Sequence, residues 1–356
     1  MTASRIPSGA PKAGAGAGAG RGGGPIALTM GEPSGIGGEI TLKAWIRRHD
    51  GLPAFFAVDD PVRLETLGRR LGLAVPVKVI EAPGEAEAAF ASALPVLAAP
   101  LATEAVAGRP DPANAEAVIG SIETAARLVI SGQAAAVVTN PIHKSTLYAG
   151  GFPYPGHTEF LAALAGIETP PVMMLAADDF RVVPVTVHES LAKAIAALDT
   201  GAITQAGLIT AAALKNDFGI VRPRLAVAGL NPHAGEDGAL GTEETEIIRP
   251  AVSALKETGI DAFGPVPPDA LFTPAARRTY DAALCMYHDQ ALIPIKAVAF
   301  DHAVNVTLGL PFVRTSPDHG TALDIAGTGK ARESSLVAAL RTAAAMARHR
   351  VHAQAA

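Results

Sequence analysis

Short apolar runs recur along the chain, and loops rich in glycine or proline separate them from segments with helical spacing. The runs that we predict to be strands span 25–30, 134–140, 181–187, 224–230 and 282–287. The segments with helical spacing span 40–48, 188–198 and 242–259. Strands that are apolar at nearly every position are typical of parallel sheets buried on both faces. The sequence therefore predicts an α/β fold with largely parallel sheets, and leaves the alanine-rich segment 88–107 open between helix and connecting strand.

Composition narrows the classes of function. The chain has 356 residues, of which 49% are hydrophobic and 18% charged, enough for one large or two medium α/β domains. The formal net charge is -5 and no lysine or arginine run occurs, so we expect no nucleic-acid partner. No apolar run reaches the roughly 20 residues of a membrane span, so we expect no membrane insertion.

The single cysteine, Cys285, excludes an intrachain disulfide and favours a reducing, cytoplasmic setting. It falls inside a predicted strand, where we interpret it as a small buried apolar side chain rather than a nucleophile. Residues 1–24 are rich in glycine, alanine and proline and lack the apolar stretch of a signal peptide. We predict that they form a disordered tail.

Three histidines follow predicted strands: His188, His233 and His288. Ligands of open α/β sheets bind beyond the carboxyl ends of the strands, so these imidazoles could converge. Three neutral imidazoles suit zinc or a similar divalent ion with positions left open for substrate. The alternative, in which each histidine only caps its own loop, stays open because the chain has no short metal-ligand spacing.

Three cations favour an anionic ligand near the same edge. Lys296 and Arg314 lie in otherwise apolar stretches, which argues against ordinary surface charges, and Lys144 follows the strand at 134–140. The stretch GEPSGIGGE does not match the dinucleotide motif G-x-G-x-x-G, so we interpret it as a tight strand-to-helix turn. Neither a Walker motif nor a G-x-S-x-G elbow is present.

Several longer motifs resemble one known family. In order between residues 26 and 331 stand GEPSGIG, TNPIHK, GHTEF, GLNPHAGE, GTEE, GPVPPDALF, MYHDQALIPIK and VNVTLGLPFVRTSPDHGTALDIAGTGKA. Together they resemble the 4-hydroxythreonine-4-phosphate dehydrogenases of pyridoxine 5′-phosphate (vitamin B6) biosynthesis. The segment HGTALDIAGTGKA is also similar to the dinucleotide-binding segment of isocitrate and isopropylmalate dehydrogenases, whose fold that family shares.

The resemblance implies an architecture of two α/β/α domains with an active-site cleft between them. The first domain would comprise 25–140 plus 289–356 and carry the dinucleotide-binding segment. The second would comprise 141–288 and carry the metal ligands and the dimer contacts. The family is a homodimer whose active site is completed across the subunit interface. One metal histidine comes from the partner, and His288 is the one we suggest.

The resemblance also implies residue roles. The metal ligands are His188, His233 and His288. The substrate-binding residues are His157, Thr158, Lys296, Asn305 and Arg314. The cofactor-binding residues are His319, Gly320, Thr321, Ala322 and Asp324. Lys296 is implied as a catalytic residue, with Lys144 as the other candidate for the general base, and Asp289 would orient its neighbour His288.

The implied reaction is the oxidation of 4-phosphooxy-L-threonine at C3 by NAD or NADP. Decarboxylation then gives 3-amino-2-oxopropyl phosphate and CO₂, with help from zinc, magnesium or cobalt. One alternative is a relative that oxidises a four-carbon sugar-acid phosphate, such as threonate or erythronate phosphate, or a cyclic dihydrodiol. Another is a phosphoacyltransferase or a non-catalytic binding protein on a related fold, against which the three strand-end histidines argue.

Overall fold

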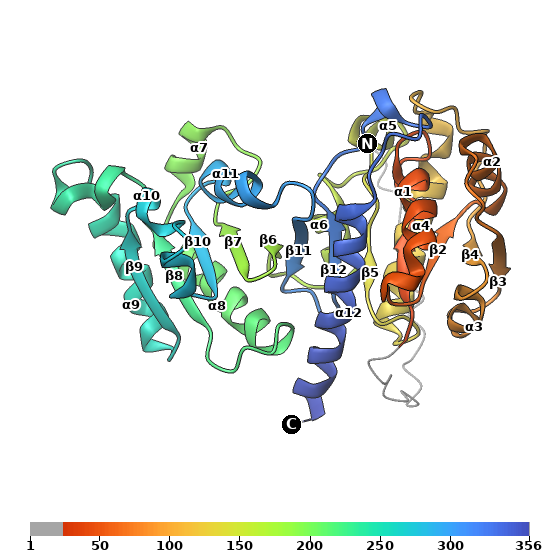
Figure 1. Cartoon of the computed structure of the whole chain (residues 1–356). Coiled ribbons are helices and arrows are strands. Elements are labelled where there is room, and N and C mark those ends of the chain that lie inside the picture. The colour runs from red at the N-terminus through yellow and green to blue at the C-terminus, as the bar shows by residue number, and fades with distance from the viewer. Residues whose placement is uncertain (1–23, 356) are drawn as a thin grey trace, which may run out of the picture.

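The computed structural model describes residues 24–355, and the twelve strands within that range form one sheet (Figure 1). The strand order is β3-β4-β2-β1-β5-β12-β11-β6-β7-β10-β8-β9. The strands are β1 Ile26–Thr29, β2 Phe55–Asp59, β3 Val77–Ile80, β4 Leu94–Ala98, β5 Val137–Val138, β6 Val172–Ala177, β7 Phe180–Pro184, β8 Arg224–Ala228, β9 Asp261–Val266, β10 Ala282–Cys285, β11 Val304–Leu308 and β12 Arg314–Pro317.

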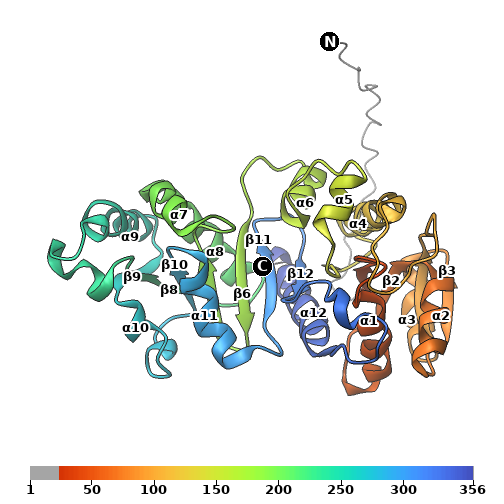
Figure 2. The same cartoon turned by 90° about the horizontal axis from the view of Figure 1, so that it is seen from above.

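Helices cover both faces of this sheet. The α-helices are α1 Gly37–Ile46, α2 Pro61–Leu71, α3 Ala86–Phe90, α4 Ala115–Ile130, α5 Lys144–Ala149, α6 His157–Ala165, α7 Leu191–Ala197, α8 Thr200–Asn216, α9 Arg249–Glu257, α10 Pro268–Leu271, α11 His288–Ala299 and α12 Ser334–Ala355. The shorter helical turns are η1 Arg47–Asp50, η2 Pro83–Glu85, η3 Pro112–Asn114, η4 Pro232–Gly238, η5 Glu244–Ile248, η6 Ala276–Arg278 and η7 Leu323–Ile325. In Figure 2, α4, α5 and α6 lie on one side of the first half of the sheet, and α1 and α12 lie on the other.

Local sequence explains why these helices begin and end where they do. In α2, the carboxylate of Asp60 accepts the N–H of Arg63 at 3.0 Å, and Pro61 occupies the first helical position. Gly72 ends the helix at a φ of 67°, a left-handed conformation that costs glycine little.

The prediction of a largely parallel α/β sheet is confirmed. Neighbouring strands pair in parallel except at β12–β11, β11–β6 and β6–β7, which are antiparallel. These three antiparallel pairs join the two parallel halves of the sheet, a first half from β3 to β5 in the strand order and a second half from β7 to β9. The sheet is therefore continuous through the whole described chain. The continuity was not foreseen, because neither β6 nor β11 was among the predicted strands.

Most predicted elements are present with shifted ends. Each of the five predicted strands overlaps an observed strand, and the helix predicted at 242–259 consists of a π-helical turn, η5, followed by α9. The open segment 88–107 contains the end of α3 and the strand β4. Cys285 is fully buried in β10, as predicted, and burial raises the pKa of its thiol far above the ordinary value.

Apolar packing differs between the two faces of the sheet. On one face a single core cluster runs through both halves, and it includes Leu28 of β1, Val306 of β11 and Leu284 of β10. On the other face there are two separate clusters, one under α4 and α6 and one under α11. Between these two clusters, β11 and β12 present polar side chains instead of apolar ones.

Some predictions lie beyond what this fold tests. The predicted tail, residues 1–24, lies outside the described residues apart from Gly24. The predicted domain boundaries stay a prediction, although α11 packs on β7, β6 and β10, which places it with the second half of the sheet. Within residues 24–355, no single helix has both the length and the apolar character needed to cross a bilayer. The sharply bent pair α7 and α8 meets that criterion by length and composition only.

Candidate active site

A polar strip crosses the middle of the sheet, where the apolar cover of one face is interrupted. Thr307 pairs with Arg314, and Asn305 pairs with Ser316, across the antiparallel strands β11 and β12, so all four side chains share one face. The alternate residues of β11 point into the core of the opposite face. The period-two pattern of this strand therefore aims its polar positions at the gap between the two apolar clusters.

Arg314 is the buried cation of the polar strip. Its guanidinium donates to Thr307 Oγ1 at 2.8 Å and to Thr139 Oγ1 at 2.6 Å, while its Nε has no acceptor among the described residues. Burial lowers the pKa of Arg314 to about 10, and the charge of Glu159 opposes this shift. A buried guanidinium that donates only to hydroxyl groups lacks the direct ion pair that usually offsets its desolvation.

The amino terminus of α6 lies near this cation. His157, the first residue of α6, has a buried Nε2 with no partner in the described chain. Burial lowers the pKa of His157 well below its ordinary value, and the charges of Arg314 and Lys144 lower it further. No side chain caps α6, and a Cβ placed on Gly156 would lie 3.5 Å from Glu159 Oε2 and 3.6 Å from Lys144 Nζ. Unpaired N–H groups, two cations and a neutral imidazole favour an anion here, and the carboxylate of Glu159 in the first turn of α6 is the one opposing charge among these groups.

Two of the three predicted metal histidines lie side by side. The ring centroids of His188 and His288 are 6.1 Å apart, and both residues line one small pocket with Thr186 and Asp289. Burial lowers the pKa of His188, and the charges of Lys144 and of His288 act in the same direction. The Nδ1 of His288 is 2.7 Å from an Asp289 carboxylate oxygen, which leaves Nε2 free to bind a metal.

His233 lies apart from this pair, in the turn η4. Within residues 24–355 no three His, Cys, Asp or Glu side chains are grouped closely enough to hold a metal ion. A single chain therefore brings together two of the imidazoles that the sequence suggested could converge. The donor chemistry of His188 and His288 suits a divalent transition ion, with the remaining ligands coming from elsewhere.

Backbone strain is concentrated at these same histidines. His188 has a φ of 51° and His233 a φ of 53°, both in the left-handed region that non-glycine residues rarely adopt. Residues 233–237 are left-handed throughout. The buried carboxylate of Glu244 anchors the start of this turn, because it accepts the N–H groups of Leu230 at 2.8 Å and Asn231 at 2.7 Å. Strain of this kind persists where the surroundings enforce it, which is common at functional sites.

Lys296 reaches the first half of the sheet from α11. Its Nζ is 3.0 Å from a carboxylate oxygen of Asp318, which follows β12, so this ion pair joins the two halves. Asn305 lies half-buried on the polar strip. Thr158 occupies the second position of the uncapped helix α6.

The predicted cofactor residues form a loop against the glycine-rich turn after β1. The N–H of Ile36 donates to the carbonyl of Thr321 at 3.0 Å, and a Cβ on Gly35 would lie only 2.9 Å from the same oxygen. Ala322 is left-handed with a φ of 42°, and the buried Nε2 of His319 has no partner among the described residues. The glycine-rich stretch is thus a strand-to-helix turn, as expected, and its glycines allow close approach of the 319–324 loop.

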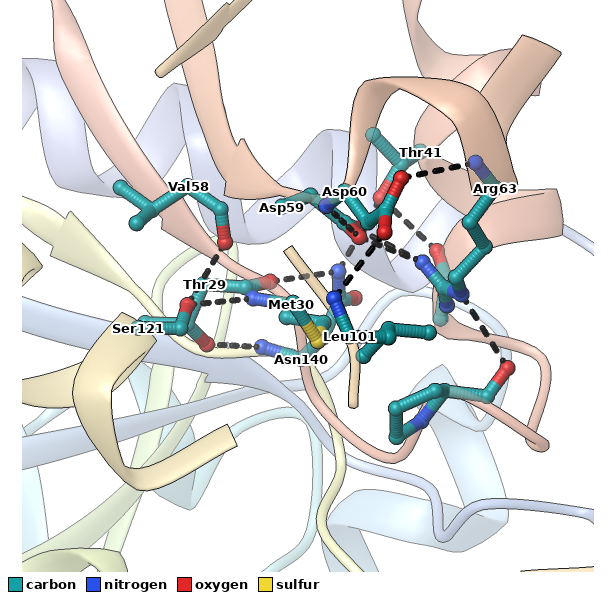
Figure 3. A network of polar contacts seen from close by, with 12 residues as sticks. Thr29, Met30, Thr41, Val58, Asp59, Asp60, Arg63, Leu101, Ser121 and Asn140 are labelled. Atoms are coloured by element: carbon teal, nitrogen blue, oxygen red, sulfur yellow. Dashed lines mark hydrogen bonds and ion pairs between the residues drawn. The ribbon is translucent and has the colours of Figure 1, made fainter. Parts of the chain in front are cut away.

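A buried network of hydrogen bonds and one ion pair holds the turn after β1 against the neighbouring strands and helices (Figure 3). Asn140, after β5, donates to the Thr29 carbonyl and to Thr41 Oγ1, each at 3.0 Å. Arg63 donates to both carboxylate oxygens of Asp59, at 2.7 and 2.8 Å, and to the carbonyl of Pro33. Burial raises the pKa of Asp59 to about 6, although the Arg63 guanidinium opposes the shift. The network is not fully satisfied, because the buried Oδ1 of Asn140 and Nη2 of Arg63 have no partner among the described residues.

Sequence reasoning missed the residues that hold the site residues in place. Thr139 and Thr307 orient Arg314, Asp318 pairs with Lys296, and Glu244 anchors the turn of His233. The alternation of apolar and polar residues in 304–308 is typical of a strand with one polar face, and it could have identified β11 and its polar side.

Comparisons with known proteins place most of the chain in one family. The family model described as "Pyridoxal phosphate biosynthetic protein PdxA" matches residues 55–343. A 4-hydroxythreonine-4-phosphate dehydrogenase of Bradyrhizobium diazoefficiens is 55% identical over 335 residues, which cover 91% of this chain and 97% of the relative. The crystal structure of a 4-hydroxythreonine-4-phosphate dehydrogenase from Klebsiella pneumoniae superposes with a TM-score of 0.83 at 36% identity, covering 91% of this chain and 99% of that one. A terephthalate 1,2-cis-dihydrodiol dehydrogenase from Burkholderia xenovorans superposes with a TM-score of 0.62 at 29% identity, covering 90% and 98%.

The fold and these matches define the class of the protein as a two-lobed α/β dehydrogenase. Within that class, the chain belongs to the family of the pyridoxal phosphate biosynthetic protein PdxA.

Proposed function

We propose that the protein oxidises 4-phosphooxy-L-threonine at C3 and decarboxylates the product to 3-amino-2-oxopropyl phosphate and CO₂, in vitamin B6 biosynthesis. Hydride leaves C3 for a nicotinamide cofactor as the hydroxyl proton is lost, and a proton returns to the carbon that loses CO₂. The chain's 55% identity to a dehydrogenase of this name supports the substrate. The observation that carries the proposal is the buried guanidinium of Arg314, which donates only to hydroxyl groups among the described residues and lies beside the uncapped start of α6.

The polar strip binds the anionic groups of the substrate. Arg314 donates to the phosphate or the carboxylate, and the free N–H groups of α6, together with Thr158, contact the same ligand. His157 is neutral at physiological pH, so it serves as a hydrogen-bonding group rather than as a charge. Asn305, on the same strip, contributes a neutral donor and acceptor.

Lys296 and Lys144 are the two candidates for the general base. Asp318 holds Lys296 by the 3.0 Å ion pair, and Lys144 lies near α6 and contributes to the lowered pKa of His188. His188 and His288 would hold a divalent metal ion, with His233 of a second copy as the third ligand and Asp289 orienting His288. When bound, such an ion lowers the pKa of the substrate hydroxyl and polarises the keto group.

The nicotinamide cofactor is assigned to the loop of His319, Gly320, Thr321, Ala322 and Asp324. The close contact between this loop and Gly35, and the unpaired buried Nε2 of His319, fit a backbone-lined site for a ligand with polar edges. A nicotinamide cofactor held there would supply the acceptor for the hydride from C3. NAD and NADP are both retained as candidates.

A direct assay tests the function. The purified full-length protein should form NADH from 4-phosphooxy-L-threonine only with a divalent metal present, and a chelator should abolish the rate. Threonate phosphate, erythronate phosphate and a cyclic dihydrodiol serve as parallel substrates. A faster rate with any of these than with 4-phosphooxy-L-threonine would overturn the substrate assignment.

A further inference from the structure

A buried ion pair joins α1 to the segment that follows the assigned cofactor loop. Glu39 and Lys43 lie one turn apart on α1, with 2.9 Å between Lys43 Nζ and Glu39 Oε1. The side chain of Glu39 is fully buried, and that of Lys43 is 18% exposed. Burial of two charges is costly unless further hydrogen bonds replace those lost to water, so the other partners of both groups show what the pair does.

The other partners of Glu39 are backbone N–H groups. Its Oε1 accepts the N–H of Ala331 at 2.9 Å, and its Oε2 accepts the N–H of Gly329 at 3.3 Å. Both residues lie between η7 and α12, outside any helix or strand. The carboxylate therefore supplies the acceptors that regular secondary structure would otherwise provide.

The ammonium group of Lys43 contacts the carbonyl groups of the same two residues. Its Nζ donates to Gly329 O at 2.8 Å and to Ala331 O at 2.6 Å. With Glu39 as the third acceptor, all three N–H donors of Lys43 are used, so none is left for a phosphate of the cofactor. Lys43 thus holds backbone, and we call these two side chains and their hydrogen bonds to 329–331 the α1 clamp.

The α1 clamp continues a contact that begins in the cofactor loop itself. The N–H of Ile36, the residue at the start of α1, donates to the carbonyl of Thr321 at 3.0 Å. Positions 36, 39 and 43 have the i, i+3, i+7 spacing of one helical face. One face of α1 therefore contacts both ends of segment 321–331, which contains three of the residues assigned to the cofactor.

This segment has a backbone that needs such support. Ala322, Gly327 and Gly329 are left-handed, with φ of 42°, 67° and 80°. Glycine loses more conformational freedom than other residues when it is ordered, so the segment keeps one conformation only if tertiary contacts hold it. A loop that is already ordered binds its ligand more tightly, because the cost of ordering is not subtracted from the binding free energy.

We propose that Glu39 and Lys43 are positioning residues for the nicotinamide cofactor, which hold the loop 319–324 in its binding conformation without touching the cofactor. The inference rests on the proposed function, in which that loop binds the cofactor. Loss of the α1 clamp weakens binding of the cofactor but not of the substrate, because Thr139 and Thr307 hold Arg314 of the polar strip independently.

Titration of the full-length protein with NADH and NADPH, followed by their fluorescence, tests the proposal. Glu39→Ala removes both acceptors, whereas Glu39→Gln keeps one carbonyl oxygen and the size of the side chain. We expect Glu39→Ala to weaken cofactor binding about tenfold or more, since hydrogen bonds to a charged group are lost. Glu39→Gln should weaken it about threefold or more, and it serves as the second variant if Glu39→Ala does not fold.

Asp217→Ala is the matched control for lost stability. Asp217 is also buried and ion-paired, with Arg350 Nε 2.6 Å from its Oδ1, and its side chain makes no hydrogen bond to 319–331. Both alanine variants should lower Tm, because each leaves a cation without its carboxylate. Only the Glu39 variant should lose affinity for the cofactor.

Substrate binding separates a positioning role from a general loss of structure. Calorimetry with 4-phosphooxy-L-threonine, in a buffer with magnesium ions but no cofactor, should give the same Kd for the Glu39 variants and the wild type. Unchanged cofactor affinity in the Glu39 variants, or an equal loss for cofactor and substrate, would overturn this inference and leave the proposed function standing. Wild-type protein that binds neither NADH nor NADPH would overturn the cofactor assignment and, with it, both proposals.

Discussion

The imidazole rings of His188 and His288 lie side by side at the ends of adjacent strands, with their centroids 6.1 Å apart. The third predicted metal histidine, His233, belongs to no group of three possible ligands in the described residues. Which histidine a partner contributes stays a prediction, and this arrangement supports the proposal that it is His233 of a second copy rather than His288.

Mixed dimers of inactive variants distinguish the two arrangements. If His188 and His288 act within one chain and His233 across the interface, mixing His188→Ala with His233→Ala creates one complete site per mixed dimer. We expect recovery of roughly a quarter of wild-type activity, since half of randomly mixed dimers are mixed and each has one of two sites intact. Activity of the refolded mixture is the measurement.

The control for this experiment is a mixture of His188→Ala with His288→Ala, which should stay inactive because neither chain then has the complete pair. The reverse outcome, with recovery only in the control mixture, would show that His288 crosses the interface. Recovery in neither mixture would contradict a shared site.

Replacing Arg314 by methionine should separate stability from activity. The side chain is buried without a carboxylate partner, so its removal should change the free energy of unfolding by no more than about 1 kcal/mol. Substrate loses a charge-assisted contact, and kcat/KM should fall roughly 30-fold or more. Urea unfolding and steady-state kinetics, with Arg348→Met as an exposed control, measure both effects. A large loss of stability with normal kcat/KM would contradict the assigned role.

The buried imidazole of His157 should make stability depend on pH. Its pKa in the folded protein is well below the ordinary value, so below about pH 6.5 the unfolded chain binds a proton that the folded chain does not. The resulting stability is present above that pH and is lost as the pH falls, by at most about 1.4 kcal/mol per pH unit. His157→Gln should remove this loss in urea titrations from pH 7 to 5, whereas the exposed His49→Gln should retain it.

Asp59 should have the opposite effect. Burial raises its pKa to about 6 in the folded protein, so between about pH 4 and 6 the folded chain binds more protons than the unfolded one. Its contribution to stability therefore decreases by up to about 3 kcal/mol as the pH rises through this window. Asp59→Asn cannot titrate, and its stability relative to wild type should rise over the same range. A constant difference between the two proteins from pH 4 to 7 would contradict the raised pKa.

The sequence allowed prediction of the parallel part of the fold better than of its centre. Runs such as 224–230 are apolar at nearly every position, because both faces of their strands are buried, and this signal is local. The strands β6 and β11 depend on antiparallel partners that are distant in the chain, and β11 alternates with polar residues because one of its faces lines the site. Pairing of this kind is decided by tertiary packing.

The candidate site was likewise predictable only in part, since the sequence identifies some of its residues but not the contacts that hold them. The apolar surroundings of Arg314 already indicated a binding role, the resemblance supplied His157, and the structure places Arg314 near His157 at the uncapped start of α6. Composition and spacing gave no indication that Thr139 and Thr307 would hold Arg314, because hydroxyl groups at strand ends are common and their partners are set by register. The left-handed backbone of His188 and His233 was also beyond prediction, since non-glycine residues rarely adopt that conformation, although histidine does so more often than most.

The unbroken sheet has a mechanical consequence. Two lobes joined by flexible linkers can swing apart as rigid bodies, but these lobes share backbone hydrogen bonds across β12, β11 and β6. A rigid-body change in the distance between the lobes that carry His157 and His188 must then come from twisting those central strands, at an elastic cost spread over many hydrogen bonds. Amide hydrogen exchange in β11 would therefore report on substrate-induced closure more directly than exchange in any surface loop.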